Sequence, residues 1–268
     1  MEHFVWNIDP NIFKFGAIQL RWYGVLFVAS FFIGLEIMKW VYRREGKDPA
    51  VLDNFLMYVI VGAVVGARLM HCFAYEPDFY LSHPLEILYV WKGGLASHGG
   101  MLGVILALYL FARRYNEDVM WILSRATLPG MVTAAFVRIG NFFNSEILGL
   151  PTDKPWGIIF SRVDNIPRHP VQLYEAAAYF VILGVLLWVY RHATFAFATK
   201  ILPGLFLLLL FTARFVLEYT KTEQADYTTA LPFTVGQMLS MPFVLLGVFW
   251  VLWAFAGTSK AARWQSTH

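Results

Sequence analysis

Long runs of apolar residues constrain this chain more than any other feature of its sequence. A bilayer core about 30 Å thick needs about 20 apolar residues per helix, so each such run is a candidate membrane span. The runs are apolar on all sides, which excludes soluble helices with one apolar stripe. We therefore expect an all-α polytopic membrane protein with one domain, 1–268, and about seven transmembrane helices, at residues 20–41, 54–74, 96–112, 119–143, 170–190, 201–219 and 234–256.

Composition supports a membrane protein and excludes several other classes. Hydrophobic residues make up 58% of the chain and charged residues 15%, whereas a soluble domain carries about 25% charged residues. The formal net charge of +3 is too small to indicate a nucleic-acid partner. A single cysteine, Cys72, excludes a disulfide framework. Nothing in the sequence implies a metal site or an organic cofactor.

The distribution of lysine and arginine predicts the orientation of the spans. With the N-terminus outside, every inner segment carries at least two basic residues, as the positive-inside rule requires: Lys39, Arg43, Arg44 and Lys47; Arg113 and Arg114; Arg191 and Lys200; Lys260 and Arg263. The N-terminus is therefore expected outside and the C-terminus in the cytoplasm. The long connections 75–95 and 144–169 then lie outside, and their polar character predicts a small cap. The first residues lack the features of a cleavable signal peptide.

Costly ionisable residues fall at similar depths in several spans. Arg68 lies 14 residues past Asn54 and Arg214 lies 13 residues past Ile201, which places both about 20 Å up from the inner ends. Arg138, His98 and Tyr23 also fall near the outer ends of their spans. Ionisable groups in a membrane are functional candidates, and guanidinium groups match phosphate oxygens. We therefore expect a polar chamber near the outer face that takes a phospholipid head group.

Other interpretations of these residues remain open. Arg214 and Glu218 are four residues apart and so can pair on one helix face. Arg68 can extend to the interface, and a lone His98 is more often structural than catalytic. The same ionisable residues are compatible with a membrane transporter or with a different phospholipid head-group enzyme, although transporters usually show repeats and midplane sites.

Two motifs are more specific than composition. In the stretch from Gly93 to Gly103, Gly99 and Gly103 form a GxxxG helix-packing face beside His98. In the second stretch, spacings of three place Arg138, Asn141 and Asn144 on one helix face. These side chains and Glu146 need polar partners if they are buried in lipid.

On these motifs the chain resembles the prolipoprotein diacylglyceryl transferases of bacterial plasma membranes. The resemblance rests on the HGG element at His98 and on the R-x-G-N-F-x-N-x-E-x-x-G signature from Arg138 to Gly149. It extends from about residue 20 to 240 through Arg21-Trp-Tyr23-Gly24, Gly66-Ala-Arg68, Arg168-His169-Pro170-Val-Gln172-Leu-Tyr174-Glu175, Arg214-Phe-Val-Leu-Glu218 and Gly236-Gln237. Some relatives have a tyrosine where this chain has Leu210, so no tyrosine role is carried over there.

The resemblance implies transfer of the diacylglyceryl group from phosphatidylglycerol to the lipobox cysteine of a prolipoprotein signal peptide. The products are a thioether and glycerol phosphate, and the active site faces the periplasmic side of the plasma (inner) membrane. His98, Arg138 and Arg214 are the expected catalytic residues. The expected binding residues for substrate and membrane lipid are Tyr23, Arg68, Gly99, Asn141, Asn144, Glu146, Gly149 and Glu218.

Overall fold

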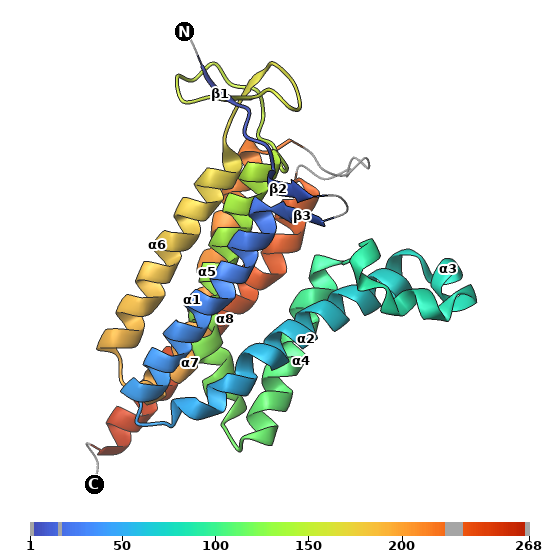
Figure 1. The fold of residues 1–268 in the computed structure, drawn as a ribbon. Helices are drawn as coiled ribbons and strands as arrows, with labels where there is room; N and C mark the ends of the chain where they lie inside the picture. The colour runs from blue at the N-terminus through green and yellow to red at the C-terminus, as the bar shows by residue number, and fades with distance from the viewer. Residues whose placement is uncertain (1–2, 16–17, 223–232, 266–268) are drawn as a thin grey trace. The chain divides into compact units, whose positions relative to one another are not determined.

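The computed structural model describes residues 3–15, 18–222 and 233–265, and these contain eight α-helices and five short strands (Figure 1). The chain divides into two compact units. Unit 1 comprises Met1–Ile37 and Thr127–His268, and unit 2 comprises Met38–Ala126. Each unit is described by itself below.

Within the described residues, six helical segments are long and apolar enough to cross a membrane, which confirms a polytopic all-α protein. They are Trp22–Arg44, Pro49–Tyr75, Val119–Asn144, Val171–His192, Phe195–Thr220 and Val235–Ala256. The third predicted span, 96–112, forms helix α4 (Ser97–Arg114) but is not among these six. Its glycine-rich start and its two terminal arginines make it less apolar than the others.

The sixth predicted span, 201–219, lies within a longer helical segment, Phe195–Thr220. Helix α7 runs from Phe195 to Leu217. The hydroxyl of Thr194 accepts a hydrogen bond from the Phe197 backbone N–H at 3.3 Å, which caps the helix six residues earlier than its apolar run suggests.

Unit 1 is a helix bundle with a small cap. It holds most of α1 (Trp22–Arg44) and α5 (Val119–Asn144), and all of α6 (Val171–His192), α7 and α8 (Val235–Gln265). Helix α7 packs along both α6 and α8. Strand β1 (Phe4–Trp6) and the C-terminal end of α8 lie at opposite ends of the bundle (Figure 1).

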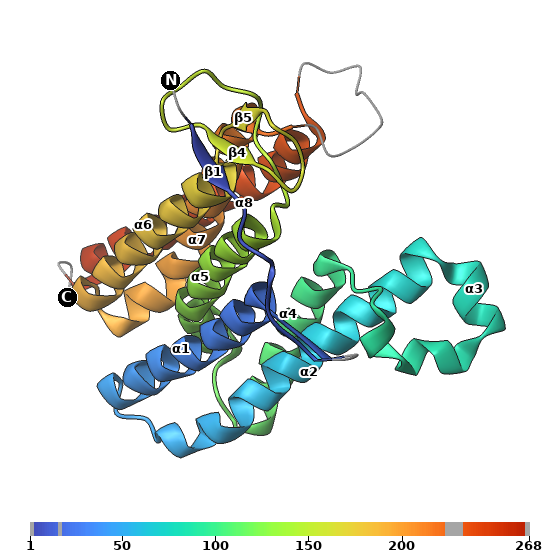
Figure 2. The ribbon, with the colours of Figure 1, turned by 45° about the horizontal axis from the view of Figure 1, so that its top comes forward.

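The predicted outer loop 144–169 folds with the N-terminal segment into a three-stranded sheet (Figure 2). Strand β4 (Ile158–Phe160) pairs in parallel with β1, and β5 (Pro167–Arg168) pairs antiparallel with β4. Trp6 packs on Phe142 of α5, with ring centroids 4.3 Å apart, and this contact anchors the sheet to the helix end. Strands β2 (Asn11–Phe15) and β3 (Ile18–Arg21) form a separate hairpin that leads into α1.

In unit 2, helices α2 (Leu52–Met70) and α4 lie side by side in closest contact (Figure 1). Glycines make this approach possible. A Cβ atom at Gly103 would lie 2.0 Å from the Gly62 carbonyl oxygen, and one at Gly66 would lie 2.3 Å from the Gly99 carbonyl oxygen. The GxxxG packing face predicted at Gly99 and Gly103 is therefore confirmed.

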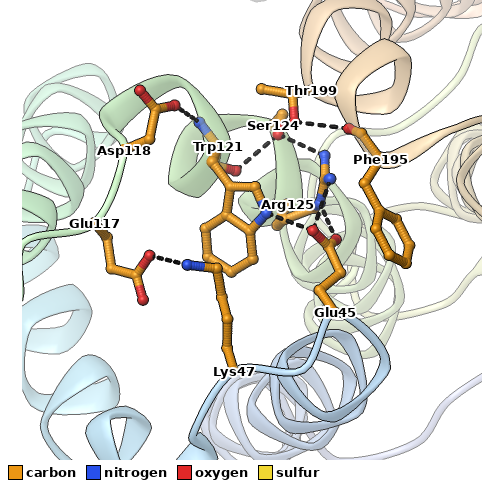
Figure 3. A network of polar contacts seen from close by, with 9 residues as sticks. All are labelled: Glu45, Lys47, Glu117, Asp118, Trp121, Ser124, Arg125, Phe195 and Thr199. Carbon is orange, nitrogen blue, oxygen red and sulfur yellow. Dashed lines mark hydrogen bonds and ion pairs between the residues drawn. The ribbon is translucent and has the colours of Figure 1, made fainter.

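A buried ionic network joins the end of α1 to the start of α5 (Figure 3). Arg125 has no exposed side-chain surface, and its Nε donates to Glu45 at 2.6 Å. The indole N–H of Trp121 donates to the same carboxylate at 2.6 Å. Lys47 pairs with Glu117 and lies over the Trp121 ring, 4.5 Å from its centroid. Arg125, an expensive charge in a predicted span, is thus fully partnered.

The segment between α2 and α4, predicted as part of a polar cap, is mostly helical. A π-helical turn, His71–Tyr75, leads into α3 (Pro77–Ser82), and two 3-10 turns follow at Pro84–Leu88 and Val90–Lys92.

Candidate active site

The C-terminal end of α5 carries the polar residues predicted from the second motif. An Nη1 N–H of Arg138 donates to Asn141 Oδ1 at 3.3 Å. The amides of Asn141 and Asn144 each donate to the carboxylate of Glu146, at 3.0 and 3.1 Å. The structure thus brings these four side chains into one hydrogen-bonded chain, with Asn141 buried and Glu146 exposed.

The backbone directly after α5 is strained. Ser145 and Ile147 have φ values of +56°, in the left-handed region that β-branched residues rarely occupy. The buried Gln172 of α6 donates from Nε2 to the Glu146 carbonyl at 2.5 Å and holds this turn in place. Such strain persists only where the surroundings fix it, which is common at functional sites.

A buried carboxylate on α6 fixes Arg138. Glu175 has no exposed side-chain surface, and its Oε2 lies 3.0 Å from Arg138 Nε. Its other oxygen lies 2.8 Å from Lys221 Nζ, and Lys221 also pairs with Glu218 at 3.1 Å. We call Arg138, Glu175, Glu218 and Lys221 the ionic cluster. Glu175 was not assigned a role from the sequence, although an acidic residue in an apolar helix was a signal. Lys221 was also missed, because it lies just past a predicted span.

The backbone after α7 pairs with the backbone that follows α5. Lys221 forms an antiparallel bridge with Gly149, and Leu150 N–H donates to the Thr220 carbonyl at 2.9 Å. Gly149 is buried, and a Cβ there would lie 2.3 Å from the His169 carbonyl oxygen. Gly149, predicted to bind substrate, therefore also has a packing reason to be glycine.

Arg214 lies near the ionic cluster. Both Arg214 and Arg138 interact electrostatically with Tyr179, a buried residue one turn from Glu175 on α6. Among the described residues, Glu218 pairs with Lys221 and Arg214 has no ion pair, so the predicted Arg214–Glu218 pair does not form. The carboxylate of Glu218 instead lies against Gly236 at the start of α8, where a Cβ would be 2.1 Å from it.

Tyr23, at the start of α1, joins the same region. Its ring fills the space left at Gly140 of α5, where a Cβ would lie 2.6 Å from Tyr23 Cδ2. Tyr23 is close enough to Arg138 and Glu146 for electrostatic interaction with both. Unit 1 therefore brings together all the predicted site residues that it contains: Tyr23, Arg138, Asn141, Asn144, Glu146, Gly149, Arg214 and Glu218.

The remaining predicted residues belong to unit 2. His98 is exposed at the start of α4, and its neighbour Gly99 is buried against Gly66 of α2. Arg68 is 3% exposed. Its guanidinium donates to four backbone carbonyls, those of Glu86, Ile87, Gly93 and Gly94. In this geometry Arg68 supports a loop.

Comparison with known proteins identifies the family. A family model described as prolipoprotein diacylglyceryl transferase matches residues 10–253. The chain belongs to this family. A transferase of the family from Tolumonas auensis, named phosphatidylglycerol--prolipoprotein diacylglyceryl transferase, is 50% identical over 257 residues, which cover 96% of this chain and 98% of that protein. One with the same name from Chloroherpeton thalassium is 50% identical and covers 92% of each chain. A third, from Bacteroides fragilis, is 36% identical and covers 96% of this chain and 97% of that protein.

Membership of the transferase family agrees with the chemistry of unit 1. Arg138 and Lys221 pair with the buried carboxylate of Glu175, and Arg214 lies near Tyr179, one turn further along α6. Such an arrangement suits an anionic lipid head group. The resemblance seen in the motifs is thereby confirmed, and the chain is a multi-pass membrane protein of this family.

Proposed function

We propose that this protein transfers the diacylglyceryl group of phosphatidylglycerol to the lipobox cysteine of a prolipoprotein, forming a thioether and releasing glycerol phosphate. The family and the names of the relatives support this reaction. The observation that carries it is the ionic cluster. Glu175 holds Arg138 from its Nε side, while Arg214, which has no ion pair among the described residues, lies near the same Tyr179.

The reaction makes one bond and breaks one. The sulfur of the cysteine attacks the glycerol carbon that carries the phosphate, so a C–S bond forms as the C–O bond to the phosphate breaks. The electron pair of the broken bond leaves on glycerol phosphate, and the thiol proton goes to a base. Because a thiol is a weak nucleophile until it loses its proton, the site needs a base as well as cations.

Arg138 and Arg214 are the proposed cations. Guanidinium presents a planar fork of N–H donors, and the contact with Glu175 uses Arg138 Nε. One outer N–H group donates to Asn141, and the remaining outer N–H groups are proposed to bind phosphate oxygens while Glu175 fixes the orientation of the guanidinium. A preorganised cation of this kind stabilises the charge that develops on the leaving phosphate.

His98 is the proposed base, and the exposed imidazole at the start of α4 is accessible for this role. Glu146 and Glu218 are the alternative proton acceptors. Asn141, Asn144 and Tyr23 are proposed to bind the glycerol hydroxyls and the head group. Gly99 and Gly149 permit close approach of the backbone, and Arg68 supports the site indirectly.

We further propose that the protein resides in the bacterial plasma membrane with this chemistry near its outer face. The three-stranded cap and the end of α5 lie at the same end of unit 1 (Figure 2). The excess of basic residues on the opposite segments supports an outer position for that end.

The test is a transfer assay with purified protein in detergent. It contains phosphatidylglycerol and a peptide with a lipobox cysteine, and the matched control peptide has serine in place of that cysteine. Mass spectrometry is expected to show one diacylglyceryl group on the cysteine peptide and an equal amount of released glycerol phosphate. Lipid consumption without peptide modification would indicate a hydrolase and contradict the proposal. The absence of both products with folded protein would do the same.

A further inference from the structure

The segment between α2 and α4, residues 73–95, has an apolar outer surface. Six of its large apolar side chains are between 45% and 74% exposed: Tyr75, Phe79, Leu81, Leu85, Leu88 and Trp91. A water-facing loop of this length would present polar side chains there, and apolar patches of this kind usually mark an interaction surface. We call residues 73–95 the paddle.

The inner side of the paddle is polar. Arg68 of α2 is 3% exposed and donates to the Glu86 and Gly93 carbonyls at 2.6 Å, and to those of Ile87 and Gly94 at 3.0 and 3.2 Å. Its guanidinium also lies 4.9 Å from the centroid of the buried Tyr80 ring. The paddle thus packs its backbone carbonyls around the Arg68 guanidinium and exposes large apolar side chains, together with the polar side chains of Glu76, Asp78, Ser82 and His83.

This arrangement satisfies the backbone where water is scarce. Carbonyl groups left without partners in lipid cost several kcal/mol each, so irregular backbone survives there only with internal donors. One guanidinium supplies donors to four carbonyls, two in the 3-10 turn Pro84–Leu88 and two at Gly93 and Gly94. Arg68 therefore supplies the internal donors that a broken helical segment needs in lipid.

The paddle is continuous with membrane-spanning structure. The span that contains α2 extends through the π-helical turn to Tyr75, and Ala96 N–H donates to the Ala67 carbonyl at 3.0 Å, which ties the start of α4 to α2. Tyr75 and Trp91 are 62% and 74% exposed, and these amphipathic aromatic residues favour the boundary between head groups and hydrocarbon.

We propose that the paddle lies in the membrane interface, with its apolar side chains in lipid at the boundary between head groups and acyl chains, and that Arg68 braces it there. Its occupant is bilayer lipid, because the exposed side chains combine aliphatic and aromatic residues as interfacial helices do. The proposal is independent of the transfer reaction.

Site-directed spin labelling tests the proposal directly. Because Cys72 is the only cysteine, a Cys72→Ala background accepts single labels at Leu81→Cys, Leu85→Cys and Leu88→Cys. The full-length labelled protein is placed in phosphatidylglycerol–phosphatidylethanolamine vesicles. The collision rate of the spin label with oxygen reports its exposure to lipid, and the collision rate with a water-soluble nickel complex reports its exposure to water. Labels on the paddle are expected to give an oxygen-to-nickel ratio several-fold above that of Asp153→Cys, an exposed position in the 144–169 loop. Val181→Cys, 67% exposed on α6, is the lipid reference.

Two results would overturn the proposal. A ratio at residue 85 equal to that at residue 153 would place the paddle in water. Low collision rates with both reagents would mean that polypeptide covers it, either a second copy or a bound peptide. The brace is tested separately. Arg68→Ala is expected to increase label mobility at residues 85 and 88, whereas Arg43→Ala, at an exposed arginine in the same unit, leaves it unchanged. Unchanged mobility in Arg68→Ala would remove Arg68 from the proposal.

Discussion

Arg138 Nε lies 3.0 Å from Glu175 Oε2, and Glu175 has no exposed side-chain surface. A carboxylate buried to this degree is stable as an anion only because cations surround it, here Arg138 and Lys221. The same contact uses the Nε side of the guanidinium, and one outer N–H group of Arg138 donates to Asn141 Oδ1 at 3.3 Å. Glu175 therefore has both a structural and a positioning role.

Glu175→Ala is expected to destabilise unit 1 strongly, because it leaves the largely buried Arg138 and the buried Lys221 without their shared carboxylate. Breaking a buried pair from one side costs about 3–5 kcal/mol of unfolding free energy. Denaturant titration of the purified protein in detergent measures the loss. Lys221→Met is expected to cost less, since Glu175 retains Arg138 as a partner. Asp53→Ala, at an exposed carboxylate on α2, is the control and should change little. Equal stability of Glu175→Ala and Asp53→Ala would show that the pair is not important for folding.

Arg138→Lys is expected to lower the rate of transfer by about 10²-fold or more without loss of folded protein. Lysine keeps the charge and can still approach Glu175, but it lacks the planar fork that binds phosphate while its Nε holds Glu175. The lipobox-peptide assay at saturating phosphatidylglycerol measures the effect on kcat. A wild-type kcat in this variant would mean that a positive charge at residue 138 is sufficient for transfer without the guanidinium geometry.

His98→Ala is expected to abolish most transfer, by about 10²–10⁴-fold, if His98 is the base. Because His98 is exposed, its removal should leave thermal stability unchanged. His83→Ala, at another exposed histidine in unit 2, serves as the matched control. Activity of the His98→Ala variant would show that His98 is not the base and would leave Glu146 or Glu218 as the proton acceptor.

Gly103→Ala is expected to destabilise the α2–α4 pair, because the new Cβ would lie 2.0 Å from the Gly62 carbonyl oxygen. Overpacking of this kind costs about 1–3 kcal/mol. Gly184→Ala in α6 meets nothing within 4 Å and should instead stabilise its helix by about 0.5–1 kcal/mol. Thermal unfolding of both variants in detergent measures the two shifts. Shifts of the same sign would contradict the close approach of α2 and α4.

The cap should depend on pH through Asp164. Hydrogen bonds from Arg168, including one of 2.6 Å, hold the pKa of Asp164 below its ordinary value of 3.8. A carboxyl group with a lowered pKa stabilises the fold fully above its ordinary pKa and loses that contribution as the pH falls through the lowered value. Hydrogen exchange in the 144–169 loop, corrected for intrinsic rates, should therefore accelerate only below about pH 4. Asp164→Asn should remove this dependence and Asp153→Asn should not.

Sequence reasoning located the helices because each apolar run is a local property. The seven predicted runs correspond to helices. Helix α7 begins six residues before its predicted run because the Thr194 cap precedes the apolar run, and α8 continues past residue 256 to Gln265. The strands of the cap were not predicted. Each has five residues or fewer, and their pairing depends on contacts such as that of Trp6 with Phe142, which local patterns do not reveal.

The candidate site was predicted only in part, because some of its contacts lie within one helix and others join distant segments. Arg138, Asn141 and Asn144 have helical spacing, so their contact followed from the sequence. The partners of Glu175 come from other segments, and Lys221 falls in a loop where a basic residue is unremarkable in sequence. Arg68 resembled a phosphate ligand by residue type, yet its donors are directed at four backbone carbonyls. Residue type indicates what a side chain can bind, and only tertiary structure decides what it does bind.

The network around Arg125 also bears on how the protein is made. Glu45 precedes Arg125 by 80 residues, so at about 5–20 residues per second the ribosome releases it some 4–16 s earlier. During that interval Glu45 lacks the contacts with Arg125 and Trp121. Synthesis of α2 and α4 is complete before α5 leaves the ribosome, and Arg125 then pairs with Glu45 at the C-terminal end of α1. Closure of this ion pair is thus a late step in the biogenesis of unit 2, and a nascent chain stalled before Trp121 would retain an accessible Glu45.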